Sequence, residues 1–139
     1  MENQDDIPKK EVKSGENKVF VTYVADDNVA LGLYVSVFSI LKKLIKKRKY
    51  LVLVVDVGLS KKSREKISSL FSKSSNSEVK LISTPRDRLK NLKYPRNFGR
   101  SAYLILLVPE LVTQSIKKIV YIDADTLIIK DKKTYITKE

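Results

Sequence analysis

Residues 119–129 read IVYIDADTLII, in which an apolar run ends in two aspartates one residue apart and a second apolar run follows. A run of β-branched residues and tyrosine without polar alternation is typical of a strand buried on both faces of a sheet. Carboxylates at the end of such a strand need a cation or strong hydrogen-bond donors. Asp123 and Asp125 therefore predict a Mg²⁺ or Mn²⁺ site that shares its ion with a diphosphate. The alternative is an acidic turn without a ligand.

Size and composition limit the chemistry that the chain can perform. Its 139 residues are enough for one domain with a core, but too few for two. The chain contains no cysteine and no histidine, which excludes disulfides, thiolate zinc sites and histidine bases. The N-terminus lacks an apolar signal segment, and no run is long enough to span a bilayer, so we expect a cytoplasmic location.

The net charge of +12 raises the question of a nucleic-acid partner. Lysines outnumber arginines by 22 to 6, whereas readers of bases and phosphates depend on the arginine fork. The densest basic cluster, at residues 42–49, falls near the C-terminal end of an expected helix, where cations suit the helix dipole. A solvated basic face is therefore favoured, and a role toward nucleic acid, anionic lipid or acidic glycan is the alternative.

Hydrophobic periodicity divides the chain into alternating strands and helices. Residues 1–17 are polar and charged, and we expect a disordered tail there, followed by one domain over 18–139. Residues 84–99 contain two prolines and a glycine, and we expect a long loop. The apolar patterns predict strands at 19–25, 50–57, 79–82, 119–122 and 127–129. They predict helices at 29–47, at 60–73 after a capping serine, and at 100–115 with an interruption at Pro109.

This order of elements predicts an α/β fold, a three-layer α/β/α Rossmann-like domain with a mostly parallel sheet. Ligands of such sheets bind beyond the carboxyl ends of the strands. Asp26, Asp27 and Asn28 follow the first strand, and the Asp123/Asp125 pair follows the last long one. We therefore expect both groups at one edge of the sheet. The alternative for residues 26–28 is a turn and helix cap without a ligand. Asp56, in the second expected strand, is interpreted as a simple strand end.

Several blocks of the chain, taken in order, resemble the family 8 glycosyltransferases. They are VTYVADDN at 21–28 with the helix start ALGL at 30–33, VDVGLS at 55–60, PELV at 109–112 and KIVYIDADTL at 118–127. The blocks cover about residues 18–131. The resemblance implies a GT-A type nucleotide-sugar fold, a UDP-sugar donor and Mn²⁺. It further implies transfer of a hexose with retention of configuration to a glycan, lipid or protein acceptor that the sequence does not identify.

Carried over position by position, the resemblance implies roles for four residues. Asp26 and Asn28 would contact uracil and ribose. Asp123 would contact the metal and the ribose, and Asp125 the metal. The family's third metal ligand is a histidine, and this chain has none, so Mn²⁺ or Mg²⁺ should bind weakly. The sequence identifies no catalytic residue.

Family 8 domains continue for roughly as long again after the segment that resembles residues 118–131. We therefore expect a truncated or degenerate form that holds the nucleotide-binding half and has little activity on its own. An unpaired strand edge promotes association, so a homo-oligomer or a partner chain is expected at the open edge of the sheet. The alternatives are a non-catalytic nucleotide-binding or assembly module completed by a partner and, less favoured, a basic nucleic-acid binder.

Overall fold

The computed structural model describes residues 18–43, 48–84, 103–112 and 116–129. The expected tail at 1–17 and nearly all of the expected loop at 84–99 lie outside these ranges. The described strands form one sheet in the order β3-β2-β1-β4, and every neighbouring pair is parallel. Their bounds are β1 Lys18–Ala25, β2 Lys49–Asp56, β3 Ser77–Ser83 and β4 Val120–Tyr121.

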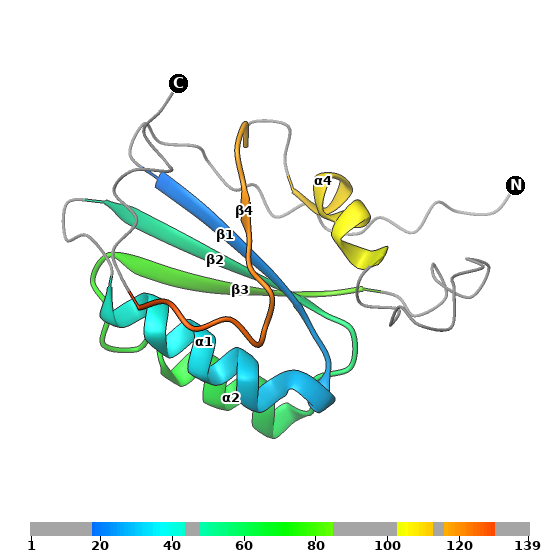
Figure 1. Cartoon of the computed structure of the whole chain (residues 1–139), viewed down its shortest axis with the longest axis horizontal. Coiled ribbons are helices and arrows are strands. Elements are labelled where there is room, and N and C mark those ends of the chain that lie inside the picture. The colour runs from blue at the N-terminus through cyan, green and yellow to red at the C-terminus, as the bar shows by residue number, and fades with distance from the viewer. Residues whose placement is uncertain (1–17, 44–47, 85–102, 113–115, 130–139) are drawn as a thin grey trace, which may run out of the picture.

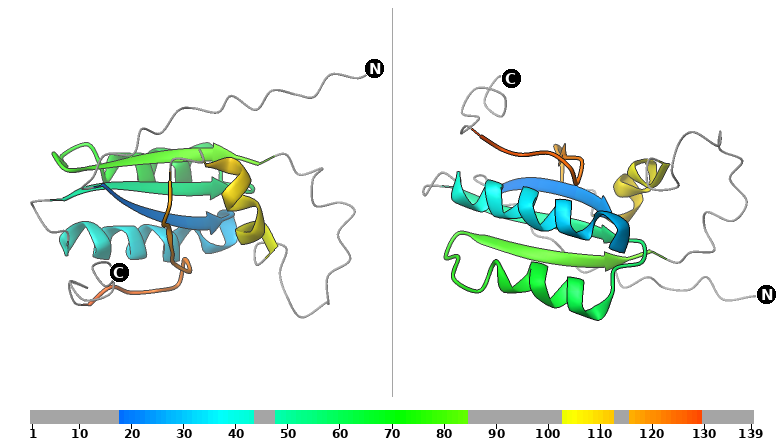
Figure 2. Two further views of the ribbon diagram at one scale, coloured as in Figure 1. Left: turned by 90° about the horizontal axis from the view of Figure 1, so that it is seen from above. Right: turned by 60° about the horizontal axis from the view of Figure 1, so that its bottom comes forward.

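Helices cover both faces of this sheet (Figures 1 and 2). One face carries α1, Ala30–Lys42, which follows the short 3-10 helix η1, Asp27–Val29, and α2, Lys61–Ser69. The other face carries the 3-10 helix η3, Ile105–Leu107, which leads into α4, Val108–Leu111. The described part of the chain is thus the predicted α/β domain with a parallel sheet. None of its helices is long and apolar enough to cross a membrane.

The central strands β1 and β2 are buried on both faces because nearly all of their residues are apolar. Alternate side chains point to opposite faces of a strand. Val21 and Tyr23 of β1 pack with α1 and α2, whereas Phe20 and Val24 of the same strand belong to the clusters on the face of α4. The expected strands at 19–25 and 50–57 are therefore confirmed with shifts of one residue at their ends.

The serine predicted to cap α2 does so, because Ser60 Oγ accepts a hydrogen bond from the Ser63 amide at 3.2 Å. The predicted end of this helix, near residue 73, is wrong, since α2 ends at Ser69. The hydroxyls of Ser69 and Ser72 donate to the carbonyls three residues before them. Serine side chains that bond the local backbone in this way compete with helical hydrogen bonds.

Three predictions near the C-terminal half of the domain need correction. The apolar run at 119–122 is not a strand buried on both faces: β4 has two residues, and Val120 is 40% exposed, because among the described strands β4 pairs with β1 alone. Residues 127–129 form no strand and instead run along α1. Pro109 does not interrupt a helix but lies in the first turn of α4, where proline needs no amide donor.

Candidate functional site

The end of β1 brings the predicted residues Asp26 and Asn28 into one turn. Asp26 Oδ1 accepts a hydrogen bond from the Asn28 amide at 2.9 Å, and Asp26 Oδ2 accepts one from Asn28 Nδ2 at 3.2 Å. Asp26 thereby caps η1, as a turn and cap assignment predicts. Asn28 is exposed and Asp26 half-buried, so both side chains stand at the surface beyond the carboxyl end of β1.

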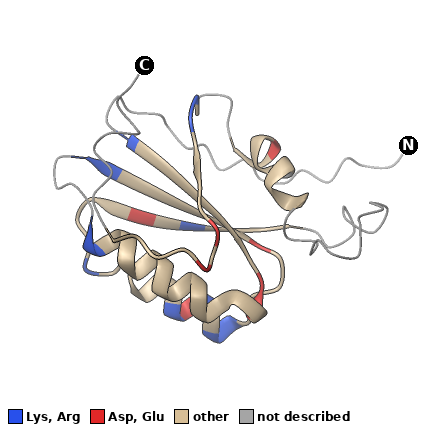
Figure 3. Ribbon diagram, in the orientation of Figure 1, with Lys and Arg blue, Asp and Glu red and all other residues tan. Residues whose placement is uncertain are grey.

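The acidic turn, residues 123–126, follows β4 next to that edge. The Ile122 amide donates to the Thr22 carbonyl of β1 at 3.0 Å, and the Thr126 amide donates to the Asp123 carbonyl at 3.0 Å. Asp123 and Asp125 are exposed, whereas Ala124 between them is buried. Figure 3 shows that β1 and β2 begin in basic residues and are followed by acidic ones at their carboxyl ends. Both acidic groups thus follow neighbouring parallel strands, as the order of elements predicts.

The acidic turn rests on the first turn of α1 at Gly32. A Cβ atom on this residue would lie 2.9 Å from the Ala124 carbonyl oxygen, which is closer than a side chain tolerates. Only glycine therefore permits the helix and the turn to approach this closely. Sequence reasoning missed this contact, although an isolated glycine inside an apolar helix pattern is a signal for close backbone packing.

Two serines of α1 tie the segment after the acidic turn to the core. Ser39 Oγ donates to the Ser36 carbonyl at 2.7 Å and accepts from the Ile128 amide at 2.9 Å. The Ser36 hydroxyl bonds the buried Tyr23 hydroxyl at 2.9 Å, and burial raises the pKa of Tyr23 to about 12, so this contact stays uncharged. Ser39 thus holds the segment that follows Asp123 and Asp125 against α1, and Ser36 joins α1 to β1.

Tyr121 of β4 lies two residues before Asp123 of the acidic turn. Burial, a hydrogen bond to Asp123 and the charges of Asp123 and Asp125 together raise its pKa to about 12. Tyr121 is half-buried and packs against the apolar cluster on the face of α4. The Tyr121 hydroxyl therefore stays uncharged beside the acidic turn.

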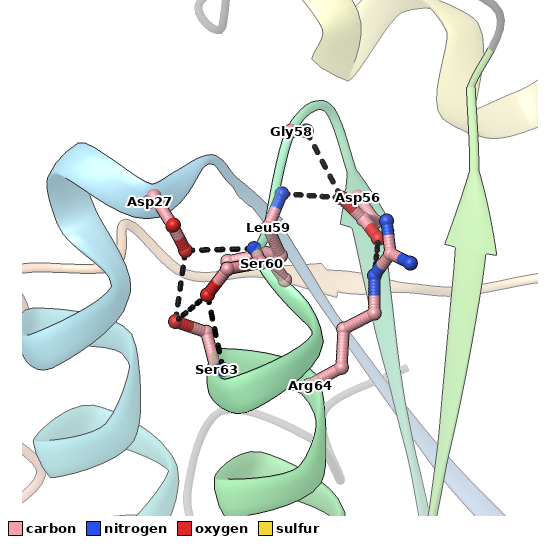
Figure 4. A network of polar contacts seen from close by, with 7 residues as sticks. All are labelled: Asp27, Asp56, Gly58, Leu59, Ser60, Ser63 and Arg64. Atoms are coloured by element: carbon pink, nitrogen blue, oxygen red, sulfur yellow. Dashed lines mark hydrogen bonds and ion pairs between the residues drawn. The ribbon is translucent and has the colours of Figure 1, made fainter.

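A second polar network lies at the end of β2 (Figure 4), and in it both oxygens of the Asp56 carboxylate have partners. The Asp56 side chain is 1% exposed, its Oδ1 accepts from the Gly58 and Leu59 amides at 2.9 and 2.7 Å, and its Oδ2 lies 2.6 Å from Arg64 Nε. Gly58 has a φ of 141°, which glycine adopts without strain. Asp56 thus does more than end a strand: it organises the connection from β2 to α2.

Asp27 joins this network to η1. Its Oδ1 accepts hydrogen bonds from the Ser60 amide and the Ser63 hydroxyl, each at 2.8 Å, and these donors hold the pKa of Asp27 below its ordinary value. Beside it, a cavity of about 250 Å³ lies between the ends of β2 and β3 and the first turn of α2. Asp27 is thus engaged in structure, whereas its neighbours Asp26 and Asn28 bond only each other among the contacts described here.

The donors of the acidic turn suit a divalent cation that binds together with a phosphate ligand. Among the described residues, no three carboxylates, histidines or cysteines converge. Asp123 and Asp125 supply the two carboxylates of the turn, and Mg²⁺ or Mn²⁺ takes about six oxygen ligands. The remaining positions would be filled by phosphate oxygens and water, and a metal alone would bind weakly.

Comparison with known proteins relates this geometry to a family. The chain resembles WbbM, a bifunctional glycosyltransferase, with 21% identity and a TM-score of 0.70 over 88% of this chain and 21% of that one. It resembles the galactosyltransferase LgtC, solved with donor and acceptor sugar analogues, with 20% identity and a TM-score of 0.69 over 82% and 40%. Mouse xyloside xylosyltransferase 1 follows with 15% identity and a TM-score of 0.57 over 83% and 45%.

These likenesses, all below 25% identity, establish the fold, and the chain spans less than half the length of each of these three proteins. No curated protein sequence matches the chain. The sequence profile described as glycosyl transferase family 8, however, matches residues 20–137, which is most of the chain and includes both acidic groups of the site. The chain therefore belongs to glycosyl transferase family 8.

Proposed function

We propose that this chain binds a UDP-sugar through Mn²⁺ or Mg²⁺ and forms the nucleotide-binding half of a retaining hexosyltransferase. The observation that carries the proposal is the placement of Asp26 and Asn28 beyond β1, and of the exposed Asp123 and Asp125 beyond its parallel neighbour β4. Ligands of parallel α/β sheets bind at this edge. Family membership supports a sugar nucleotide as the ligand.

Each residue of the site has a chemical role in this proposal. Asp123 and Asp125 hold the cation, and Asp123 also accepts from the ribose, while Asp26 and Asn28 contact the nucleoside. A bound cation would offset the charge of the diphosphate and so help UDP to leave. Burial and the nearby carboxylates raise the pKa of Tyr121 to about 12, so its hydroxyl stays uncharged beside the proposed metal site.

The sugar and the acceptor are not specified by these residues. The described part of the chain presents donors for the nucleotide and the metal, and the proposed acceptor, a glycan, lipid or protein, would contact other surfaces. The chain spans 21–45% of the three similar glycosyltransferases, so transfer by the whole protein is itself part of the proposal. We expect the isolated chain to bind UDP without efficient turnover.

Titration calorimetry of UDP into the folded protein tests the proposal directly. Binding is expected with Mn²⁺ and should disappear with excess EDTA. The double variant Asp123→Ala/Asp125→Ala should lose metal-dependent binding while its circular dichroism spectrum stays that of the wild type, because both side chains are exposed. Absence of UDP binding to a folded wild-type sample, or equal binding by the double variant, would refute the metal–diphosphate site.

The edge of the sheet favours a second candidate function, that of an assembly module completed by a partner chain or a second copy. β4 pairs with β1 on one side over two residues, and Val120 is 40% exposed. An unpaired strand edge can pair with another chain. Light scattering across a dilution series should then show association, and a monomer at every concentration together with metal-dependent UDP binding would decide against this candidate.

A further inference from the structure

The outward face of α1 carries an apolar stripe. Leu31, Val35 and Phe38 are 78%, 47% and 45% exposed. Their spacing of four and three residues places them on one face of the helix. The buried residues Leu33 and Val37 face the sheet on the opposite side. The helix contains no charged residue before Lys42, so it is apolar on both its inner and its outer face.

The segment after the acidic turn extends this stripe. The Ile128 amide bonds Ser39 of α1, and the flanking residues Leu127 and Ile129 are 59% and 69% exposed. Figure 1 shows this segment running along α1. Leu31, Val35, Phe38, Leu127 and Ile129 together are the α1 patch. A helix that is apolar all round is normally covered, and exposed apolar patches mark interaction sites.

Basic residues adjoin the α1 patch. Lys42 and Lys43 at the end of α1 are exposed, and Lys42 Nζ lies 5.2 Å from the centre of the Phe38 ring. Leucine and phenylalanine on one surface, with lysines whose ammonium groups extend beside them, are the features of helices that lie in a membrane interface. The apolar residues enter the region between headgroups and acyl chains, and the lysines attract anionic headgroups.

Charge favours a membrane over a second copy as the occupant of the α1 patch. A second copy would bring two chains of net charge +12 together, and their repulsion opposes association. A surface of anionic phospholipid gains from the same charge. We infer that the α1 patch, with Lys42 and Lys43, binds the surface of an anionic phospholipid membrane without spanning it. The inference does not rest on nucleotide binding, although the α1 patch adjoins the acidic turn, since Leu127 follows Asp125 by two residues.

Vesicle flotation with the full chain tests it. Wild-type protein is mixed with vesicles of phosphatidylcholine alone or of phosphatidylcholine and phosphatidylglycerol in equal parts, at low and at physiological salt. Binding should be at least roughly tenfold tighter to the anionic vesicles and should weaken with salt. The triple variant Leu31→Gln/Val35→Gln/Phe38→Gln keeps the net charge and should lose roughly tenfold or more in affinity.

Leu106→Gln is the matched control, since Leu106 is 70% exposed in η3 on the other face of the sheet. This variant should float as the wild type does. Circular dichroism of each variant confirms that it is folded. The inference fails if wild-type protein does not bind the anionic vesicles, or if the triple variant binds as well as the wild type. It also fails if the triple change abolishes a wild-type dimer and leaves vesicle binding unchanged, because the occupant would then be a second copy.

Discussion

Two groups of aspartates stand beyond the same edge of the sheet and differ in how many partners they have. Asp56 is buried, accepts two backbone amides and is paired with Arg64. Asp123 and Asp125 are exposed, and their carboxylates accept no backbone amide in the part of the chain that the structure describes. A carboxylate whose oxygens are all engaged holds the fold, whereas exposed carboxylates on a fixed turn remain available to a cation. The number of partners thus separates residues that maintain the structure from residues that can bind a ligand.

The largest difference between the two groups is expected in the free energy of unfolding when each carboxylate is removed in turn. Asp56→Ala should lower the free energy of unfolding by about 3–5 kcal/mol, because it leaves two amides without an acceptor and Arg64 without its partner. Asp125→Ala should change it by less than about 0.5 kcal/mol, as is usual at an exposed site. Urea unfolding monitored by circular dichroism measures both values.

Arg64→Ala is the control for this comparison. It removes the charge partner while Asp56 keeps its backbone donors, and Arg64 is 45% exposed, so the loss should be smaller, about 1–3 kcal/mol. The distinction between the two groups breaks down if Asp125→Ala destabilises the protein as much as Asp56→Ala does.

The support beneath the exposed group can be tested at Gly32. A Cβ there would meet the Ala124 carbonyl at 2.9 Å, so Gly32→Ala should shift the acidic turn and cost about 1–3 kcal/mol, against a gain in helix propensity of about 1 kcal/mol. If the proposed site is correct, metal-dependent UDP affinity should fall about tenfold or more, as it does when supporting contacts of a metal site are lost. Calorimetry of UDP with Mn²⁺ gives the affinity.

Gly58→Ala provides a matched glycine change in the Asp56 network. The φ of 141° at Gly58 strains any other residue, so this variant should also lose about 1–2 kcal/mol. It lies in the connection from β2 to α2 and should leave UDP affinity unchanged once the sample is shown to be folded. Equal losses of affinity in both glycine variants would mean that lower stability, and not a displaced acidic turn, causes the effect.

The features that were predicted correctly are those that depend on a few adjacent residues. The apolar runs of β1 and β2 and the cap at Ser60 were confirmed because each follows from a few adjacent residues. The run at 119–122 was assigned to a buried strand and is an exposed edge, because burial of a strand depends on its neighbours in the sheet. An apolar run does not specify how many neighbours it will have.

The same limit applies to the site. The parallel alternation was sufficient to bring residues 26–28 and the Asp-x-Asp motif to one edge. The contacts that hold the motif, at Gly32 and Ser39, join residues about ninety positions apart and depend on tertiary packing that no local pattern specifies. The assignment of Asp26, Asn28 and Asp123 to a nucleotide stays a prediction.

The smallest effect is expected at Asp27, an exposed carboxylate that belongs with the structural group. The Ser60 amide and the Ser63 hydroxyl hold its pKa below the ordinary value of 3.8. A depressed pKa in the folded state stabilises the protein above the unfolded pKa, and this contribution is lost as the pH falls through the folded one. The difference in unfolding free energy between wild type and Asp27→Ala should therefore shrink between about pH 5 and pH 3.

Urea unfolding of both proteins at each pH measures this difference, and acid effects common to both cancel. Ser63→Ala, which removes one of the two donors, should show a weaker pH dependence than the wild type when each is compared with its own Asp27→Ala derivative. A difference that stays constant with pH would show that Asp27 gains no stabilisation from its donors. Asp27 would then have to be placed with the carboxylates that remain available to a ligand, beside Asp26 at the end of β1.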